Sequence, residues 1–84
     1  MEKKEIGHVS HYFGKPKVAA IVLKDTLKVG DRLAFEGHTT DFETEVASIQ
    51  IEHDSVQEAK AGDNVGIKVP QRVREHDVVY KIIE

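Results

Sequence analysis

No window of this sequence longer than ten residues both keeps a helical hydrophobic period and avoids glycine and proline. Apolar residues instead alternate with polar ones or gather in short blocks, which is the pattern of β-strands. Glycine, proline, asparagine and aspartate lie between the blocks, and these residues favour tight turns. The sequence therefore predicts an all-β structure made of short strands.

We predict six or seven strands joined by short turns. Residues 42–51 form the longest predicted strand, and in it Val46 and Ile49 are three apart, which a period of two cannot place on one face. A β-bulge near Ala47-Ser48 would turn both side chains inward. Residues 52–60 are predicted to be an irregular connection anchored by Val56. The other predicted strands are residues 6–13, 17–23, 32–36, 64–69 and 77–83.

Two glycines are predicted to reverse the chain. Gly30 follows a strand-like stretch and precedes another, so it is expected to supply a positive φ at a turn, and Gly62 occupies a similar place. Asp31 and Asp63, the residues after them, are suited to bond neighbouring backbone amides. Gly66 lies inside a predicted strand, where the missing side chain lets another group approach closely.

The connections are too short for the crossovers that parallel strands require, so an antiparallel sheet is expected. A chain of 84 residues buries only a small core, and this one has no cysteine for a disulfide. Closing the sheet on itself would leave no open edge. We therefore predict a closed antiparallel barrel that forms a single domain, residues 1–84, with its core in residues 6–82.

The sequence also bears on location. No apolar leader follows residues 1–5, and the lack of cysteine fits a reducing compartment. The longest apolar run, Val18 to Leu23, is far shorter than the roughly 20 residues that cross a bilayer. We expect a cytoplasmic protein without membrane contact.

Two motifs carry a family resemblance. Thr26-Leu27-Lys28-Val29-Gly30-Asp31, and later Ala61-Gly62-Asp63-Asn64-Val65-Gly66-Ile67, resemble the two signature stretches of the second domain of translation elongation factor Tu and its relatives. The likeness spans about residues 6–82 and implies the closed six-stranded barrel of translation proteins. Residues 37–42 and 51–53 are more similar to small standalone elongation-factor-like proteins and to the C-terminal barrel of U32-type peptidases.

The sequence departs from the Tu pattern in three places. The phosphate-binding motif Gly-x-x-x-x-Gly-Lys-Ser/Thr is absent, so nucleotide hydrolysis is not expected. Residues 14–18 replace the glycine-rich Gly-Arg-Gly-Thr-Val of the family. Gln50 stands where elongation factor Tu has an acidic side chain near the terminal adenosine of charged tRNA, which makes Gln50 a candidate contact to RNA or to a partner.

Neither a metal site nor a catalytic centre is expected. His8 and His11 are three apart on a strand, which places them on opposite faces unless a bulge intervenes, and the other histidines, His38, His53 and His76, fall in separate loops. The serines lack a context that would activate a nucleophile. We expect no bound cofactor, no metal and no enzymatic activity.

Two groups of residues are candidate contact surfaces. In the first, aromatic and basic residues flank the first turn and the connection before the last strand, a combination that grips single-stranded nucleic acid in small barrels. Its members are Tyr12, Phe13, Lys15, Lys17, Arg72 and Arg74. In the second, His38 and an exposed Phe42 would suit a protein contact.

Two functions follow from these features. The first is a noncatalytic module associated with translation that contacts RNA or a ribosomal or tRNA-related partner. The second is a protein-interaction module that acts beside an enzyme such as a U32-type peptidase. The formal net charge of -3 removes any overall attraction to nucleic acid and favours the second function. The sequence carries no signal for the oligomeric state.

Overall fold

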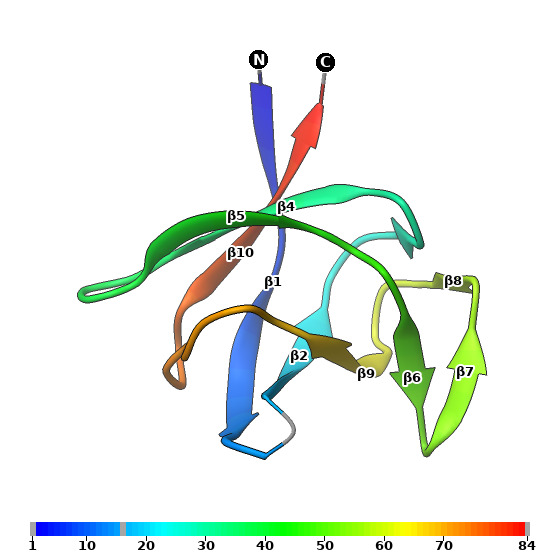
Figure 1. Ribbon diagram of the computed structural model, residues 1–84. Coiled ribbons are helices and arrows are strands. Elements are labelled where there is room, and N and C mark those ends of the chain that lie inside the picture. The colour runs from blue at the N-terminus through cyan, green and yellow to red at the C-terminus, as the bar shows by residue number, and fades with distance from the viewer. Residues whose placement is uncertain (1, 16, 84) are drawn as a thin grey trace.

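Strands and turns make up the part of the chain that the computed structural model describes, residues 2–15 and 17–83, and no helix occurs there (Figure 1). A helix long and apolar enough to cross a membrane is accordingly absent from these residues. The strands are β1 (Glu2–Phe13), β2 (Val18–Leu23), β3 (Leu27–Lys28), β4 (Arg32–Glu36), β5 (Asp41–Glu45), β6 (Ile49–Ile51), β7 (Asp54–Val56), β8 (Glu58–Ala59), β9 (Asn64–Lys68) and β10 (Val78–Ile83).

Eight of the strands form one curled sheet in the order β5-β4-β10-β1-β2-β9-β6-β7, and β3 pairs with β8 alone. Every pairing is antiparallel, as expected from the short connections. The two edge strands of the large sheet, β5 and β7, share no ladder in the described residues. The domain is therefore small and all-β, but the predicted closed six-stranded barrel is not confirmed.

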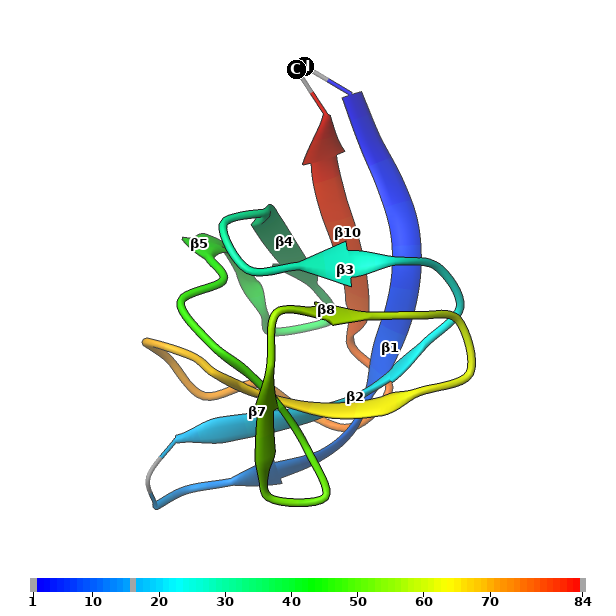
Figure 2. The same cartoon turned by 90° about the vertical axis from the view of Figure 1, so that its right-hand side faces the viewer.

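The chain that leaves β5 is hydrogen-bonded to the turn that precedes β4. The Val46 amide donates to the carbonyl of Asp31 and the Val46 carbonyl accepts from the amide of Gly30, both at 2.8 Å. Val46 is fully buried, so the backbone turns inward here and the ladder with β4 ends. The β3–β8 pair lies in front of the main sheet in Figure 2. The amide of Val29, which follows β3, donates to the carbonyl of Gln57, which precedes β8, at 3.0 Å and so continues this pairing.

Alternating side chains of the curled sheet meet in one apolar core. Along β2 every second residue is buried, and β9 shows the same alternation. Val46 and Ile49 are both fully buried, as predicted, but no single strand carries them. The predicted strand 42–51 is instead two strands, β5 and β6, separated by residues 46–48. The largest fully buried side chains are Phe35, Ile6, Ile21, Leu23, Leu27, Leu33, Ile49, Ile67, Val9, Val46, Val73 and Val79.

β1 is the longest strand and begins at Glu2, four residues before the predicted start. It passes from β10, its partner along the first half, to β2, its partner along the second, and each ladder has one register shift, between Glu5 and Gly7 and between Val9 and His11. Gly7 lies at this crossing, and a Cβ there would collide with the backbone carbonyl of Val22. Glu2 pairs with Ile83, which brings the two described ends of the chain side by side (Figures 1 and 2).

Residues 52–60, predicted to be irregular, contain the short strands β7 and β8. Val56 is half-buried and packs against the core, in the anchoring place predicted for it. A loop of two residues, Glu52 and His53, joins β6 to β7, and this tight connection keeps the following residues within reach of β6. The prediction of an irregular connection was therefore wrong.

Three turns share one set of hydrogen bonds, and they span residues 28–31, 60–63 and 74–77. In each, the amide of the closing aspartate donates to the carbonyl of the first residue, at 3.0 to 3.1 Å. The aspartate carboxylate accepts from the amide of that same first residue, at 2.8 to 2.9 Å. The third position has positive φ: 97° at Gly30, 93° at Gly62 and 77° at His76. The predictions for Gly30 and Gly62 are confirmed, and the third turn was not foreseen.

Candidate functional site

A groove of about 430 Å³ lies between the β1–β2 hairpin and the β6–β7 hairpin. Both hairpins point toward the end of the molecule away from the two labelled chain ends (Figure 1). Strands β2, β9 and β6 form its floor. Its lining residues are Phe13, Lys15, Val18, Ala20, Gln50, Glu52, His53, Asn64, Val65 and Gly66.

Small residues in the floor make the hollow. Gly66 of β9 pairs with Ala20 of β2 on one side and with Gln50 of β6 on the other. A Cβ at Gly66 would lie 3.3 Å from a methyl group of Val18, so a larger residue here would fill part of the groove and press on that side chain. The floor is thus apolar and shallow because of the residues that the sequence places on three adjacent strands.

Phe13 forms an aromatic part of the wall and is 50% exposed. Its ring meets the ring of His11 edge to face, with centroids 4.5 Å apart. One other large apolar side chain of the described residues is comparably exposed, Ile83, at the opposite end of the molecule. Aromatic side chains, phenylalanine among them, are enriched in the buried centres of protein interfaces.

The opposite wall carries Glu52 and His53, which have φ values of 50° and 72°. A two-residue hairpin loop with two positive φ values normally uses asparagine and glycine. Side chains other than glycine cost about 1–2 kcal/mol each in this conformation. Glu52 and His53 adopt this conformation despite its cost, and one carboxylate and one imidazole therefore lie on the groove wall.

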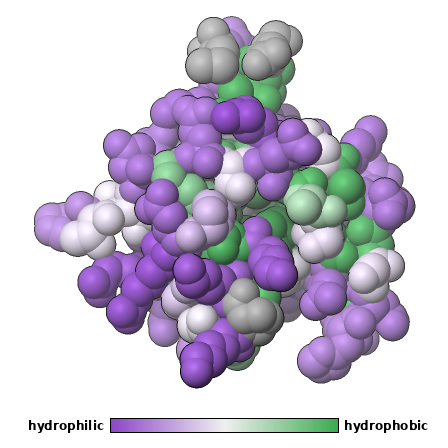
Figure 3. All heavy atoms as spheres, in the orientation of Figure 1, coloured by the Kyte–Doolittle hydropathy of each residue, from purple (hydrophilic) through white to green (hydrophobic). Residues whose placement is uncertain are grey.

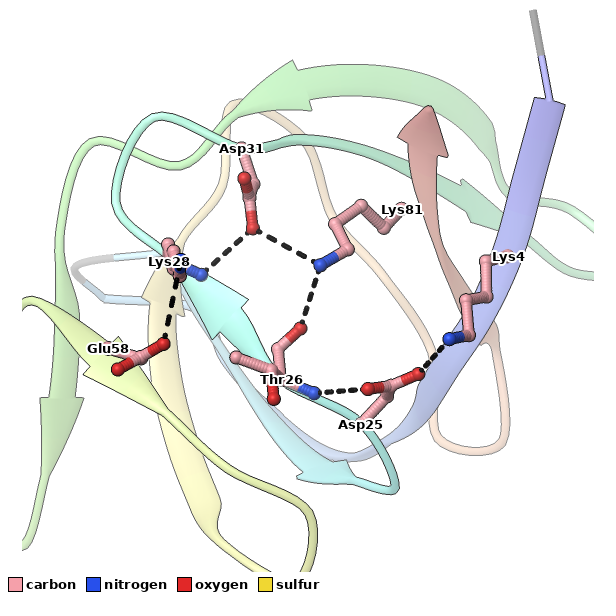
Figure 4. Close-up of polar contacts among 7 residues, drawn as sticks. All are labelled: Lys4, Asp25, Thr26, Lys28, Asp31, Glu58 and Lys81. Carbon is pink, nitrogen blue, oxygen red and sulfur yellow. Dashed lines mark hydrogen bonds and ion pairs between the residues drawn. The ribbon is translucent and has the colours of Figure 1, made fainter. Parts of the chain in front are cut away.

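Ion pairs are concentrated away from the groove. Figure 4 shows the Lys81 ammonium between the Asp31 carboxylate, 3.7 Å away, and the carbonyl of Thr26, 3.1 Å away. In the same view Lys4 lies 2.6 Å from Asp25. The hydrogen bond from Lys4, followed by the bond from the Thr26 amide, lowers the pKa of Asp25. This network joins β1, β10 and the segment that leads into β3.

The basic residues near the groove have no such partners. Lys15, Lys17 and Lys68 form no ion pair within residues 2–15 and 17–83. Lys68 borders a smaller hollow of about 210 Å³, which shares three residues with the groove and so extends it. Figure 3 shows polar side chains covering most of one face of the molecule, with apolar ones visible between them.

The first predicted surface is divided between two hollows. Phe13 and Lys15 line the groove, together with Gln50, which was predicted separately as a contact. Another hollow of about 490 Å³ is lined by His11, Tyr12, Arg72, Val73, Arg74 and Glu75. The connection from β9 to β10 therefore does approach β1, but it borders a hollow other than the groove. Lys17 is exposed and lines neither hollow.

The second predicted surface is less exposed than expected. Phe42 is half-buried, and its ring stacks on the buried Phe35 with centroids 5.1 Å apart. The two residues are directly opposite in the β4–β5 pair, which explains the contact. The prediction that Phe42 is exposed was wrong, while His38 is exposed in the turn between these strands.

The histidines do not gather. No group of three or more histidine, cysteine, aspartate or glutamate side chains is placed to hold a metal in the described part of the chain. A register shift does intervene between Val9 and His11, and both His8 and His11 are exposed. His11 instead lies 3.8 Å from the Glu75 carboxylate.

Comparison with known proteins decides the fold. The chain superposes on the C-terminal domain of a candidate U32 peptidase of Geobacillus thermoleovorans with a TM-score of 0.89 and 19% sequence identity, covering 95% of this chain and 93% of that one. The fold is that of this U32 C-terminal domain. The selenomethionine variant of the same domain gives a TM-score of 0.86 at 19% identity, over 90% of this chain and 96% of that one.

One curated sequence relative is described as a protease. An uncharacterized protease of Methanocaldococcus jannaschii is 45% identical over 83 residues, which is 98% of this chain. The chain spans 20% of the length of that protein. No family model matches the sequence. The findings thus show the fold of a U32 C-terminal domain and a sequence likeness to one fifth of a protein described as a protease. The resemblance to elongation factor Tu is not confirmed.

Proposed function

We propose that this chain is a noncatalytic binding domain that works beside a U32-type peptidase. The observation that carries the proposal is the 45% identity, over almost the whole chain, to one fifth of a protein described as a protease. The likeness to the C-terminal domain of a candidate U32 peptidase supports it. A segment that is a fifth of a larger protein fits an accessory role better than the whole reaction.

The polar groups of the chain support a role without catalysis. The Ser10 hydroxyl donates to the backbone carbonyl of Ala20 at 3.2 Å, so this hydrogen bond links β1 to β2. Ser48 borders the smaller hollow, whose other polar side chains are Gln50 and Lys68. Neither arrangement pairs a hydroxyl with a histidine, as an activated serine would require.

Affinity capture tests the proposal. The purified chain is immobilised, exposed to lysate of its source with and without nuclease, and the retained proteins are identified by mass spectrometry. We expect a U32-type peptidase to be retained in both conditions and the chain alone to release no fragments from casein. Loss of every partner after nuclease treatment, or casein cleavage by the chain, would contradict the proposal.

RNA binding is the competing function, and the cations without partners provide its test. Under our proposal the chain binds single-stranded RNA no more tightly than its variant with alanine at Lys15, Lys17, Arg72 and Arg74. Affinity that falls steeply with salt in the parent chain, and disappears in this variant, would favour RNA instead. The measurement is fluorescence anisotropy of a labelled oligonucleotide at two salt concentrations.

A further inference from the structure

We propose that the groove between the β1–β2 and β6–β7 hairpins binds a short peptide with free ends and a large apolar side chain. The side chain lies against Phe13 and the floor of the groove, the free carboxylate meets Lys15, and the free amino group meets Glu52. This inference deepens the proposed function and rests on it, because a domain that works beside a peptidase meets peptides.

The shape and lining of the groove fit a ligand of this size. Its volume of about 430 Å³ lies in the range of small-molecule sites, about 300–1,000 Å³. Val18, Ala20 and Gly66 supply an apolar floor, and the half-exposed ring of Phe13 stands beside it. An aromatic or branched aliphatic side chain would cover these surfaces and remove them from water.

The charges of the two walls are complementary to a peptide with free ends. Lys15 belongs to the hairpin on one side of the groove, and Glu52 belongs to the hairpin on the other. Within the described residues, neither side chain takes part in an ion pair. One cation and one anion, separated by an apolar floor, match an ammonium and a carboxylate separated by an apolar residue.

Two amide side chains can form hydrogen bonds with the polar backbone of such a ligand. Gln50 and Asn64 line the groove, and both residues are exposed. Each amide side chain carries a donor and an acceptor, as a peptide group does. They are thus placed to bond the peptide groups on either side of the apolar residue.

A nucleotide fits the same groove less well. Lys15 is the single cation among the lining residues, and Glu52 would repel a phosphate. The chain as a whole carries a formal charge of -3, which adds to the repulsion. The mixed charge of the walls therefore distinguishes a peptide from a nucleotide.

Nuclear magnetic resonance titration of the full chain, labelled with nitrogen-15, tests the inference. The probes are the tripeptide Gly-Phe-Gly with free ends, the same peptide acetylated, amidated or capped at both ends, the peptide Gly-Ser-Gly, and adenosine monophosphate. We expect Gly-Phe-Gly to shift the amides of Phe13, Gln50 and Gly66. We expect capping of both ends to weaken binding about tenfold, since each exposed ion pair contributes modestly.

Single substitutions assign the contacts. Phe13→Ala should weaken Gly-Phe-Gly at least about tenfold, because it removes the aromatic wall. Lys15→Gln should make the peptide with a free carboxylate and the amidated peptide bind alike. Glu52→Gln should do the same for the free and the acetylated amino end.

Matched controls lie outside the groove. Ile83→Ala removes another exposed apolar side chain, Lys60→Gln another exposed lysine, and Glu45→Gln another exposed glutamate. All three should bind Gly-Phe-Gly as the parent chain does. The inference is overturned if Gly-Phe-Gly shifts none of the groove amides, if Phe13→Ala binds it unchanged, or if adenosine monophosphate binds the groove and the peptides do not.

The inference and the proposed function fail separately. The titration needs only the chain and a peptide, whereas the capture experiment identifies a peptidase. If the chain binds Gly-Phe-Gly but retains no peptidase, the peptide-binding groove is supported and the proposed function is contradicted. If the chain retains a peptidase but binds none of the peptides, the proposed function is supported and the peptide-binding groove is contradicted.

Discussion

Replacement of His76 by glycine is expected to stabilise the protein. His76 occupies the third position of its turn with φ of 77°, where the two equivalent turns have glycine at 97° and 93°. A residue with a side chain loses about 1–2 kcal/mol in this conformation, and glycine loses about 0.5–1 kcal/mol through its greater freedom when unfolded. The net gain for His76→Gly is therefore about 0.5–1 kcal/mol.

The reciprocal substitution Gly62→His is the matched control. A Cβ at Gly62 would meet no atom within 4 Å, so its cost comes from the backbone conformation alone. We expect a loss similar in size to the gain at His76. The variant that carries both substitutions should show nearly the sum of the two effects, because no hydrogen bond joins the two turns in the described residues.

Urea unfolding followed by circular dichroism measures both effects. The midpoints should move in opposite directions while the slope of the transition stays constant, and 1 kcal/mol corresponds to about 4–8 °C in melting temperature for a domain of this size. An unchanged or destabilised His76→Gly variant, beside a destabilised Gly62→His variant, would refute the reasoning, since the imidazole would then contribute a contact worth more than the backbone cost.

Three further predictions follow from single contacts. Gly7→Ala should destabilise the fold by about 1–3 kcal/mol in urea unfolding, because its new methyl group collides with the Val22 carbonyl and the backbone must shift. Asp77→Ala should cost about 1–3 kcal/mol in the same assay, since the buried carboxylate accepts an amide hydrogen bond that no other group replaces. Lys4→Met should raise the pKa of Asp25 toward its ordinary value, about 3.9, in a carboxyl carbon titration. A carboxyl with a lowered folded pKa stabilises the fold above its unfolded pKa, and this stability is lost as the pH falls through the folded value, so the variant should lose less stability in acid than the parent does.

The sequence predicted the strand content well because alternation and turn residues are local signals. The buried positions Val46 and Ile49, the positive φ of Gly30 and the turn at Gly62 were all foreseen for this reason. The sequence could not show whether the sheet closes into a barrel. Whether two edge strands meet depends on the direction the backbone takes at Val46, which is fixed by hydrogen bonds to a distant turn.

The candidate site was predicted in part. Phe13, Lys15 and Gln50 were singled out from residue type and resemblance, and they do line one groove. Glu52 and His53 were missed because they fell in a stretch predicted to be irregular, and a left-handed loop made of glutamate and histidine gives no turn signal. The third aspartate turn was missed for a similar reason, since a histidine stands where its two counterparts have glycine.

The pairing of Glu2 with Ile83 has a mechanical consequence. The outer ends of β1 and β10 lie side by side and run in opposite directions, so a pull applied across them loads the backbone bonds of that ladder one rung after another. Strands loaded in this way peel apart, whereas strands pulled along their length must break many rungs together. Stretched between its two ends, the domain should therefore open at low force, and the peeling should start at the ends and proceed toward Gly7.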